Sequence, residues 1–170
     1  QDAADSLGMI LELAGHEVRI AHGGRQALQL AAEFHPDVVL LDIGMPDLNG
    51  YETARALREV VGKRPIIFTR RSETEGGERI AIGDEEVVLL YAAVAATRLV
   101  EFIDFEMGSD PGHLRRVREC TRRHEIRLIL SYHNVGYTPG QDYLVDRFLE
   151  AERLGADVAM VQVMPRNRAD

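Results

Sequence analysis

Patterns typical of helices and of buried strands alternate along this chain, and that alternation limits its fold more than any other feature. Leu7, Ile10, Leu11 and Ala14 recur at the three- and four-residue spacing of one helix face. Residues 38–41 form a continuous apolar run, which is typical of a strand buried on both faces of a sheet. Strands and helices that alternate with short connections favour right-handed βαβ units built on a parallel sheet.

The same alternation continues to the end of the chain and predicts six strands and six helices. No low-complexity linker separates them, so we expect a single α/β sheet. Six strands suit either an open doubly wound sheet or a (βα)8 barrel that lacks two units. The expected strands are residues 16–21, 38–41, 65–69, 100–105, 128–131 and 158–164, and the expected helices are residues 7–14, 27–34, 54–61, 87–94, 114–124 and 144–154.

The charge balance argues against a nucleic-acid partner. The chain of 170 residues has a net charge of −8 and a pI of about 5.3, so it repels phosphate backbones overall. Five arginines do gather within one expected helix, and we interpret them as its solvated face rather than as a binding patch. They are Arg115, Arg116, Arg118, Arg122 and Arg123.

The apolar content indicates a cytoplasmic globular protein without a membrane partner. The longest apolar run, residues 87–96, is much shorter than the roughly 18 residues that a membrane span needs. The single cysteine, Cys120, excludes an internal disulfide and a thiolate zinc cluster, and its expected role is packing.

Polar residues at the expected strand ends are the candidates for function, because ligands bind at the carboxyl ends of parallel strands. They are Asp42, Arg70, Arg71, Asp104, Glu106, His133 and Met164. Asp42 follows four apolar residues, where a carboxylate must be hydrogen-bonded, metal-bound or ionised at the surface. The local chemistry leaves open whether it caps the next loop or takes part in chemistry.

The segment PDVVLLDIGMPDLNGYE around Asp42 resembles the phosphoacceptor region of a response-regulator receiver domain. The resemblance covers residues 1–62, without the family's first strand, and implies a flavodoxin-like fold. It implies that Asp42 accepts a phosphoryl group and helps to hold Mg²⁺, and that Pro46 and Gly50 shape the adjacent loop. Thr69 would then be the switch residue, the Ser or Thr that the family has at the end of its fourth strand.

This receiver-like segment lacks two parts of the family's site. The acidic pair that holds Mg²⁺ belongs to the missing strand, and the lysine expected after the fifth strand is absent. Lys63 is the only lysine of the chain and precedes the strand at 65–69. Phosphoryl transfer depends on positioning and on charge stabilisation, so we expect Asp42 to be a poor acceptor.

Arg71, Glu75 and His133 follow or end strands of the second half, and a parallel sheet would bring them to one face. Histidine moves protons near neutral pH, and a carboxylate can orient it. An arginine beside them could hold an anionic substrate. A surface histidine with a chance carboxylate neighbour is the simpler alternative.

Residues 63–170 resemble the middle of type I 3-dehydroquinate dehydratase, a (βα)8-barrel lyase of the shikimate pathway. The matching segments are RPIIFTRRSETEGGE, VEFIDFEM, LILSYHNVGYTP and LGADVAMVQVMP. By this resemblance His133 transfers protons, Glu75 orients it and Arg71 binds substrate. The family's imine-forming lysine falls at Met160, whose thioether cannot form an imine.

The two resemblances predict a flavodoxin-like half joined to a partial (βα)8-barrel half, with the junction near residues 58–64. Our main interpretation is a chimera-like α/β protein without full catalytic activity. The alternative is a lyase of the 3-dehydroquinate dehydratase type, or a phosphorelay response regulator, completed by residues outside this chain. The expected partners are a small anionic substrate or a phosphodonor, with self-association through incomplete sheet edges.

Overall fold

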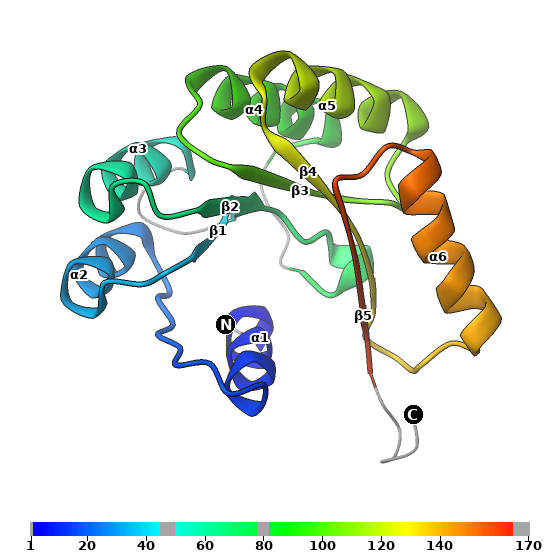
Figure 1. The fold of residues 1–170 in the computed structure, drawn as a ribbon, viewed down its shortest axis with the longest axis horizontal. Coiled ribbons are helices and arrows are strands. Elements are labelled where there is room, and N and C mark those ends of the chain that lie inside the picture. Colours follow the sequence, from blue (N-terminus) through cyan, green and yellow to red (C-terminus); the bar gives the residue numbers. More distant parts are fainter. Residues whose placement is uncertain (1, 45–49, 78–81, 165–170) are drawn as a thin grey trace.

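The computed structural model describes residues 2–44, 50–77 and 82–164, which form one five-stranded parallel sheet flanked by helices (Figure 1). Each strand pairs in parallel with the strand next to it in the sequence. The expected single parallel sheet is therefore confirmed. Its strands are β1 (Val39–Asp42), β2 (Ile66–Thr69), β3 (Phe102–Glu106), β4 (Arg127–Asn134) and β5 (Val158–Val163).

Most helices lie along the convex side of the sheet, and α1 lies apart from them (Figure 1). Local signals set several of their ends. Asp110 caps α5 by accepting hydrogen bonds from the backbone N–H groups of Gly112 and His113, and Pro111 begins that helix. The helices are α1 (Asp2–Leu13), α2 (Gly24–Phe34), α3 (Gly50–Val61), α4 (Asp84–Thr97), α5 (Pro111–His124) and α6 (Gln141–Arg153), with a short 3₁₀ turn, η1 (Glu73–Glu75), after β2.

The strands of the sheet follow one another in the order that is found in a (βα)8 barrel. The order β1-β2-β3-β4-β5 follows the sequence without a reversal. A flavodoxin-like sheet has the order 2-1-3-4-5, in which the first strand stands inside the sheet. That reversal involves the first strand, which the receiver-like segment lacks, and the five described strands run consecutively as they do in a (βα)8 barrel.

The expected strand at residues 16–21 is wrong, because this segment is irregular and pairs with no described strand. Two of its apolar side chains, Val18 and Ile20, are half-buried and pack against a helix instead. A Cβ added at Gly8 of α1 would lie 2.6 Å from Cδ1 of Ile20 and 3.7 Å from Cγ1 of Val18, so the helix backbone approaches both. The expected loop residue Pro46 lies outside the described residues, and Gly50 begins α3.

The hydrophobic core lies between the sheet and the helices and is continuous across the junction at residue 62. Tyr91 of α4 is its largest fully buried side chain. Its ring contacts Phe68 of β2 and Phe105 of β3 edge to face, with centroids 5.7 and 5.5 Å apart. Helix α4 is thus fixed over the centre of the sheet.

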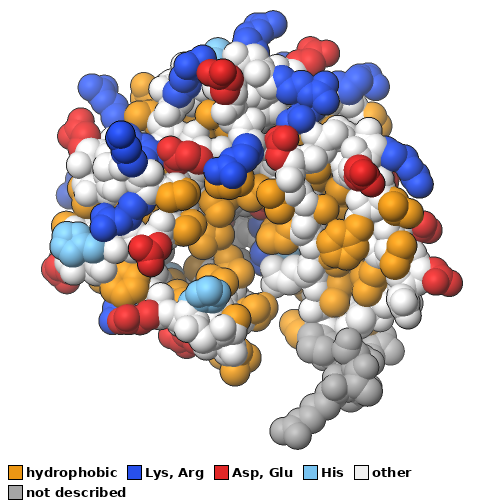
Figure 2. Space-filling model, in the orientation of Figure 1, with side chains coloured by type: hydrophobic (Ala, Val, Ile, Leu, Met, Phe, Trp, Pro, Cys, Tyr) orange, Lys and Arg blue, Asp and Glu red, His pale blue; other side chains and the backbone are white. Residues whose placement is uncertain are grey.

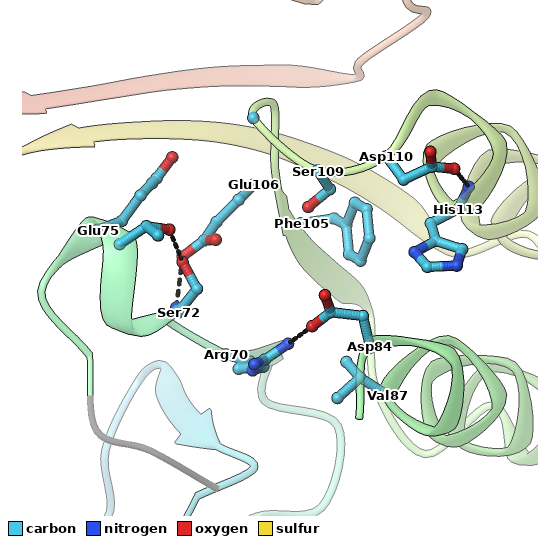
Figure 3. A pocket seen from close by; sticks show the side chains of 12 residues that line it. Arg70, Ser72, Glu75, Asp84, Val87, Phe105, Glu106, Ser109, Asp110 and His113 are labelled. Atoms are coloured by element: carbon cyan, nitrogen blue, oxygen red, sulfur yellow. Dashed lines mark hydrogen bonds and ion pairs between the residues drawn. The ribbon is translucent and has the colours of Figure 1, made fainter. Parts of the chain in front are cut away.

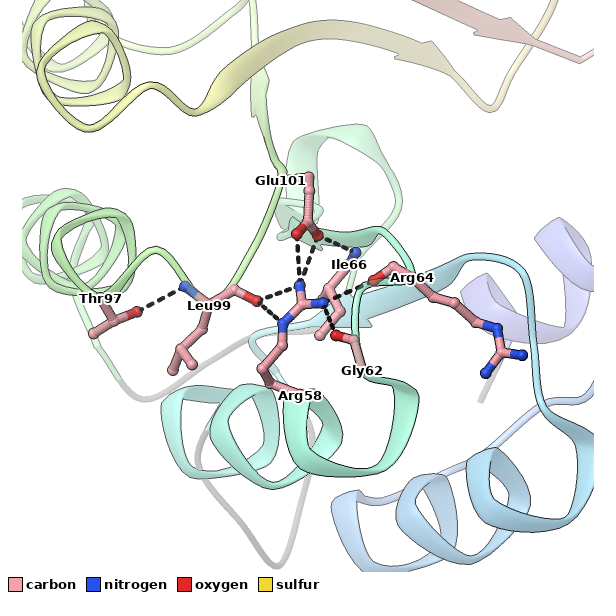
Figure 4. Close-up of polar contacts among 7 residues, drawn as sticks. All are labelled: Arg58, Gly62, Arg64, Ile66, Thr97, Leu99 and Glu101. Carbon is pink, nitrogen blue, oxygen red and sulfur yellow. Dashed lines mark hydrogen bonds and ion pairs between the residues drawn. The ribbon is translucent and has the colours of Figure 1, made fainter.

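Arg58 of α3 links the helix to the amino ends of β2 and β3 (Figure 4). Its guanidinium donates to the backbone carbonyls of Leu99, Gly62 and Arg64. It also donates to both carboxylate oxygens of Glu101, at 2.9 and 2.7 Å. These bonds hold the turn that contains Lys63 at the end of the sheet opposite to the strand ends described below.

Helices α2 to α6 lie on the convex side of the sheet and leave its concave side uncovered by them (Figure 1). Leu40 of β1 and Val158 of β5, at the two sheet edges, remain 47% and 42% exposed. Phe102 of β3 is covered by the Arg127 guanidinium, 3.8 Å from its ring centroid. In the space-filling view hydrophobic side chains border a hollow below the sheet, and charged side chains gather on the outer surface (Figure 2).

No helix in the described part of the chain is both long and apolar enough to cross a membrane.

Candidate functional site

A buried carboxylate–histidine pair lies at the carboxyl ends of the strands. Glu75 ends η1 and His133 lies near the end of β4. Nδ1 of His133 is 2.6 Å from Oε2 of Glu75, and the backbone N–H of His133 donates to the same oxygen at 3.0 Å. The His133 side chain is only 3% exposed, and the Glu75 side chain is 11% exposed. The structure thus brings together two residues that are 58 positions apart in the sequence.

The hydrogen bonds to Glu75 define which ring nitrogen of His133 can react. A carboxylate only accepts hydrogen bonds, so Nδ1 carries the proton that is shared with Glu75. Nε2 is then the atom with an available lone pair. It is buried and has no hydrogen-bond partner in the described part of the protein. This arrangement is suited to general acid–base chemistry at Nε2.

Glu106, the last residue of β3, lies beside this pair. Its Oε1 accepts a hydrogen bond from the backbone N–H of Ser72 at 2.6 Å. Burial raises the pKa of Glu106, and the negative charge of Glu75 raises it further, whereas the bond from Ser72 opposes both effects. Glu106, Glu75 and His133 are all buried, and one ligand atom from each lies within 4.8 Å of the others.

Arg71 extends the site to the last strand. It follows β2, and its Nη2 donates to Oε1 of Gln162 on β5 at 3.0 Å. Gln162 pairs in register with His133, so the guanidinium lies near the histidine pair. A half-buried arginine at this position can bind a carboxylate through two parallel hydrogen bonds.

Met160 lies on the same strand, two residues before Gln162. It pairs in register with Ser131 of β4 and is half-buried. Side chains two positions apart on a strand point to the same face, so Met160 and Gln162 share a face. Met160 is where the sequence resemblance places the imine-forming lysine. Its thioether side chain thus lies on the same face of the sheet as the site.

Asp42 and Thr69, the residues expected to form a phosphoacceptor site, pair in register at the ends of β1 and β2. Asp42 is exposed, and its Oδ1 accepts from the backbone N–H of Gly44 at 2.8 Å. The Thr69 hydroxyl donates to Oδ2 of Asp104 at 2.8 Å instead of pointing to a phosphoryl position. Burial raises the pKa of Asp104.

The Mg²⁺ that the receiver resemblance implies at Asp42 stays a prediction. The ion prefers several oxygen ligands in near-octahedral geometry. Within residues 2–44, 50–77 and 82–164, Asp42 belongs to no group of three side chains that could hold a metal. The described neighbours therefore do not form the acidic site that the receiver resemblance would require.

A cavity of about 180 Å³ opens next to Glu106, between η1 and the amino ends of α4 and α5. Figure 3 shows Glu75 and Glu106 on one side of it and Asp110 and His113 on the other. Arg70 lines the cavity and donates to Oδ1 of Asp84 at 3.1 Å. Sequence reasoning grouped Arg70 only with the strand ends and did not predict this cavity.

Two residues that build the site were missed by the sequence reasoning. Gln162 could have been found, because it is the one polar residue of the otherwise apolar segment VAMVQV. Gly77, two residues after Glu75, lies against the backbone of Arg71. A Cβ at this glycine would lie 1.9 Å from the carbonyl oxygen of Arg71, so no larger residue fits the observed backbone.

The comparisons with known proteins identify one family over most of the chain. The sequence profile of type I 3-dehydroquinase matches residues 21–170. The 3-dehydroquinate dehydratase of Albidiferax ferrireducens is 43% identical over 117 residues, which are 69% of this chain and 44% of that protein. The enzyme of Geobacillus thermodenitrificans is 40% identical over 118 residues, 69% of this chain and 46% of that protein.

Solved structures agree with this family. The 3-dehydroquinate dehydratase of Geobacillus kaustophilus has a TM-score of 0.80 at 31% identity and covers 87% of this chain and 60% of its own. The type I enzyme of Clostridium difficile has a TM-score of 0.81 at 26% identity, with coverages of 87% and 61%. This chain spans less than half the length of the first two curated relatives.

The receiver resemblance has no support in these comparisons. The profile match begins at residue 21 and therefore includes most of the segment 1–62 that we compared with a receiver domain. The chimera with a phosphorelay domain is thus unsupported, and the alternative interpretation as a dehydratase-type chain is the better one.

Proposed function

The chain belongs to the type I 3-dehydroquinase family, and from that premise we propose that it carries the proton-transfer and anion-binding part of a 3-dehydroquinate dehydratase site. The observation that supports this most directly is the buried 2.6 Å contact between Glu75 and His133 at the carboxyl ends of the strands. Such an interaction fixes the ring orientation of the histidine and stabilises its protonated form during the reaction.

His133 is the proposed general acid and base. Dehydration of a β-hydroxy ketone removes a proton from the carbon next to the carbonyl and a hydroxyl group from the following carbon. Nε2 of His133 can accept the first proton and return one to the departing hydroxyl, while Nδ1 remains bonded to Glu75.

Arg71 is the proposed anion-binding residue. Its guanidinium donates to a neutral amide oxygen of Gln162, and a carboxylate would be a stronger acceptor than this amide. A small cyclic carboxylate held there would lie beside His133, because Gln162 and His133 are paired neighbours. The substrate class is therefore a small hydroxy-keto acid such as 3-dehydroquinate.

We propose further that this chain binds such a substrate but forms no imine with it. Met160 offers no amine. Lys63 lies in the turn before β2, at the amino ends of the strands, and Arg58 fixes the residues on either side of it. A lysine side chain cannot reach from that end of the sheet to His133 at the other.

Borohydride trapping with 3-dehydroquinate, read by intact mass and peptide mapping, tests this proposal. The unchanged chain should give no reduced adduct, and Met160→Lys should give one at position 160. Lys63→Arg combined with Met160→Lys is the matched control and should leave that adduct in place. Substrate binding, measured by calorimetry, should weaken about tenfold or more in Arg71→Ala.

Two results would contradict the proposal. An adduct on Lys63 of the unchanged chain would mean that the site lies at the opposite end of the sheet. Equal affinity for 3-dehydroquinate in the unchanged chain and in Arg71→Ala would remove the anion-binding role.

A further inference from the structure

We propose that Gln162 is a positioning residue of the anion site, which holds the Arg71 guanidinium beside His133 and so sets where a ligand carboxylate is bound. This inference rests on the proposed anion-binding role of Arg71 and adds the residue that decides how well a carboxylate fits there. Three features support it: the place of Gln162 on β5, the chemistry of its bond to Arg71, and the path of that bond across the sheet.

Gln162 is the one polar residue of β5. The strand has the sequence VAMVQV, and Gln162 is half-buried on it. It pairs in register with His133 and shares one face of the strand with Met160, so its side chain points to the face of the sheet that carries His133. A half-buried amide costs free energy unless it is hydrogen-bonded, and its partner here is Arg71.

The chemistry of this bond fixes the orientation of the amide. The nitrogens of a guanidinium donate hydrogen bonds and accept none, so only Oε1 of Gln162 can face Arg71. The distance from Nη2 of Arg71 to this oxygen is 3.0 Å. Gln162 therefore holds a cation without neutralising its charge, whereas a carboxylate at the same position would form an ion pair with it.

Arg71 depends on this bond for its position. In the part of the chain that the structure describes, the Arg71 guanidinium forms no other hydrogen bond and no ion pair. A free arginine side chain has many rotamers and loses that freedom when it binds a ligand. The bond to Gln162 removes part of this loss before the ligand arrives, and such preorganisation raises affinity.

The bond crosses the concave face of the sheet. Arg71 follows β2 and Gln162 lies on β5, so β3 and β4 stand between them (Figure 1). Arg71 therefore reaches over the strands that carry Asp104 and His133. Burial raises the pKa of Asp104, and the positive charges of His133 and Arg71 are among the effects that oppose this rise, so both charges lie near that carboxyl.

A fixed guanidinium sets the geometry for the ligand. Gln162 takes one of the five N–H groups of Arg71 and leaves donors for a two-bond contact with a carboxylate. That carboxylate is then held at a set distance from Nε2 of His133, the proposed proton acceptor. The site therefore favours small acids whose carboxylate and acidic C–H group meet Arg71 and His133 at the same time, as a productive geometry for proton transfer requires.

Calorimetric titration of the full chain with 3-dehydroquinate, in a double-mutant cycle of Gln162→Met and Arg71→Ala, tests the inference. Methionine keeps the length of glutamine and lacks its amide oxygen, so Gln162→Met should weaken binding about fivefold or more. In the Arg71→Ala background the same change should alter the affinity less than about twofold, because Gln162 acts through Arg71. A merely structural role would weaken binding equally in both backgrounds.

Two further variants complete the design. Gln162→Glu keeps the side-chain length and the acceptor but neutralises Arg71 and repels a carboxylate, so it should weaken binding by roughly a hundredfold. Gln29→Met, at an exposed position of α2, is the matched control and should leave the affinity unchanged. Circular dichroism shows whether each variant is folded.

Two outcomes would overturn the role of Gln162 alone. One is an affinity of the folded Gln162→Met that equals or exceeds that of the unchanged chain, and the other is a loss of equal size in both backgrounds. Undiminished affinity in Gln162→Glu leads to the same conclusion without the methionine variant. If Arg71→Ala binds as tightly as the unchanged chain, the proposed anion site is wrong and the role of Gln162 falls with it.

Discussion

Arg58→Ala should lower the stability of the whole sheet, because this one side chain links α3 to the starts of two strands. Its Nε and Nη2 donate to the Leu99 carbonyl at 2.9 and 2.6 Å, and its Nη1 donates to the Arg64 carbonyl at 2.9 Å (Figure 4). Glu101 accepts from the same guanidinium and from the backbone N–H of Ile66 at 2.8 Å. Removal of Arg58 leaves these acceptors without their donor.

The expected loss is about 3 kcal/mol in the free energy of unfolding. Bonds from the guanidinium to half-buried carbonyls contribute roughly 1 kcal/mol each, and two such carbonyls belong to Leu99 and Arg64. The ion pair adds at most about 1 kcal/mol, since the side chains of Arg58 and Glu101 are 19% and 34% exposed and solvent screens them. For a chain of this size the sum corresponds to a fall in Tm of roughly 6–12 °C.

Urea unfolding monitored by far-UV circular dichroism measures this loss. Arg58→Lys keeps the charge but loses the fork of donors, so its stability should fall between those of the unchanged chain and Arg58→Ala. Arg55→Ala, an exposed arginine of the same helix, is the matched control and should change stability by less than about 0.5 kcal/mol. A loss below about 1 kcal/mol for Arg58→Ala would refute the reasoning.

Two further substitutions test the core and a helix cap. Tyr91→Phe should lower the free energy of unfolding by about 1 kcal/mol, because it removes the 2.8 Å hydrogen bond from the phenol to the Asp104 carbonyl and keeps the edge-to-face ring contacts. An unchanged urea midpoint would contradict this prediction. The backbone N–H groups of His113 and Gly112 lower the pKa of Asp110 in the folded protein. The ionised carboxylate therefore stabilises α5 fully above the unfolded pKa of about 3.9, and this stabilisation is lost as the pH falls through the lower folded pKa. The stability difference from Asp110→Ala should therefore be present at pH 7 and shrink on acidification, and a pH-independent difference would exclude the charge as its cause.

The sequence determined the type and order of most elements, because the spacing of apolar residues is a local property. The continuous apolar run at 38–41 indicated a strand buried on both faces, and the structure has β1 at Val39–Asp42 but leaves Leu40 47% exposed. The same reasoning failed at residues 16–21, where Val18 and Ile20 alternate as in a strand but are covered by α1. A local pattern says which side chains must be buried, and it does not say which element buries them.

The strand-end rule also located part of the site. His133 and Glu106 could be placed at one edge of a parallel sheet, because each lies within two residues of the end of an expected strand. Family resemblance added the roles of Glu75 and Arg71 and the position of Met160, which local chemistry alone does not supply.

The contacts within the site were decided by tertiary structure alone. The bond between Glu75 and His133 depends on how the loop after β2 returns across β3 to β4. The bond between Arg71 and Gln162 joins residues 91 positions apart and depends on the register of β5 against β4. Register and loop path are set by the packing of the whole sheet, so the periodicity of a single segment contains no information about them.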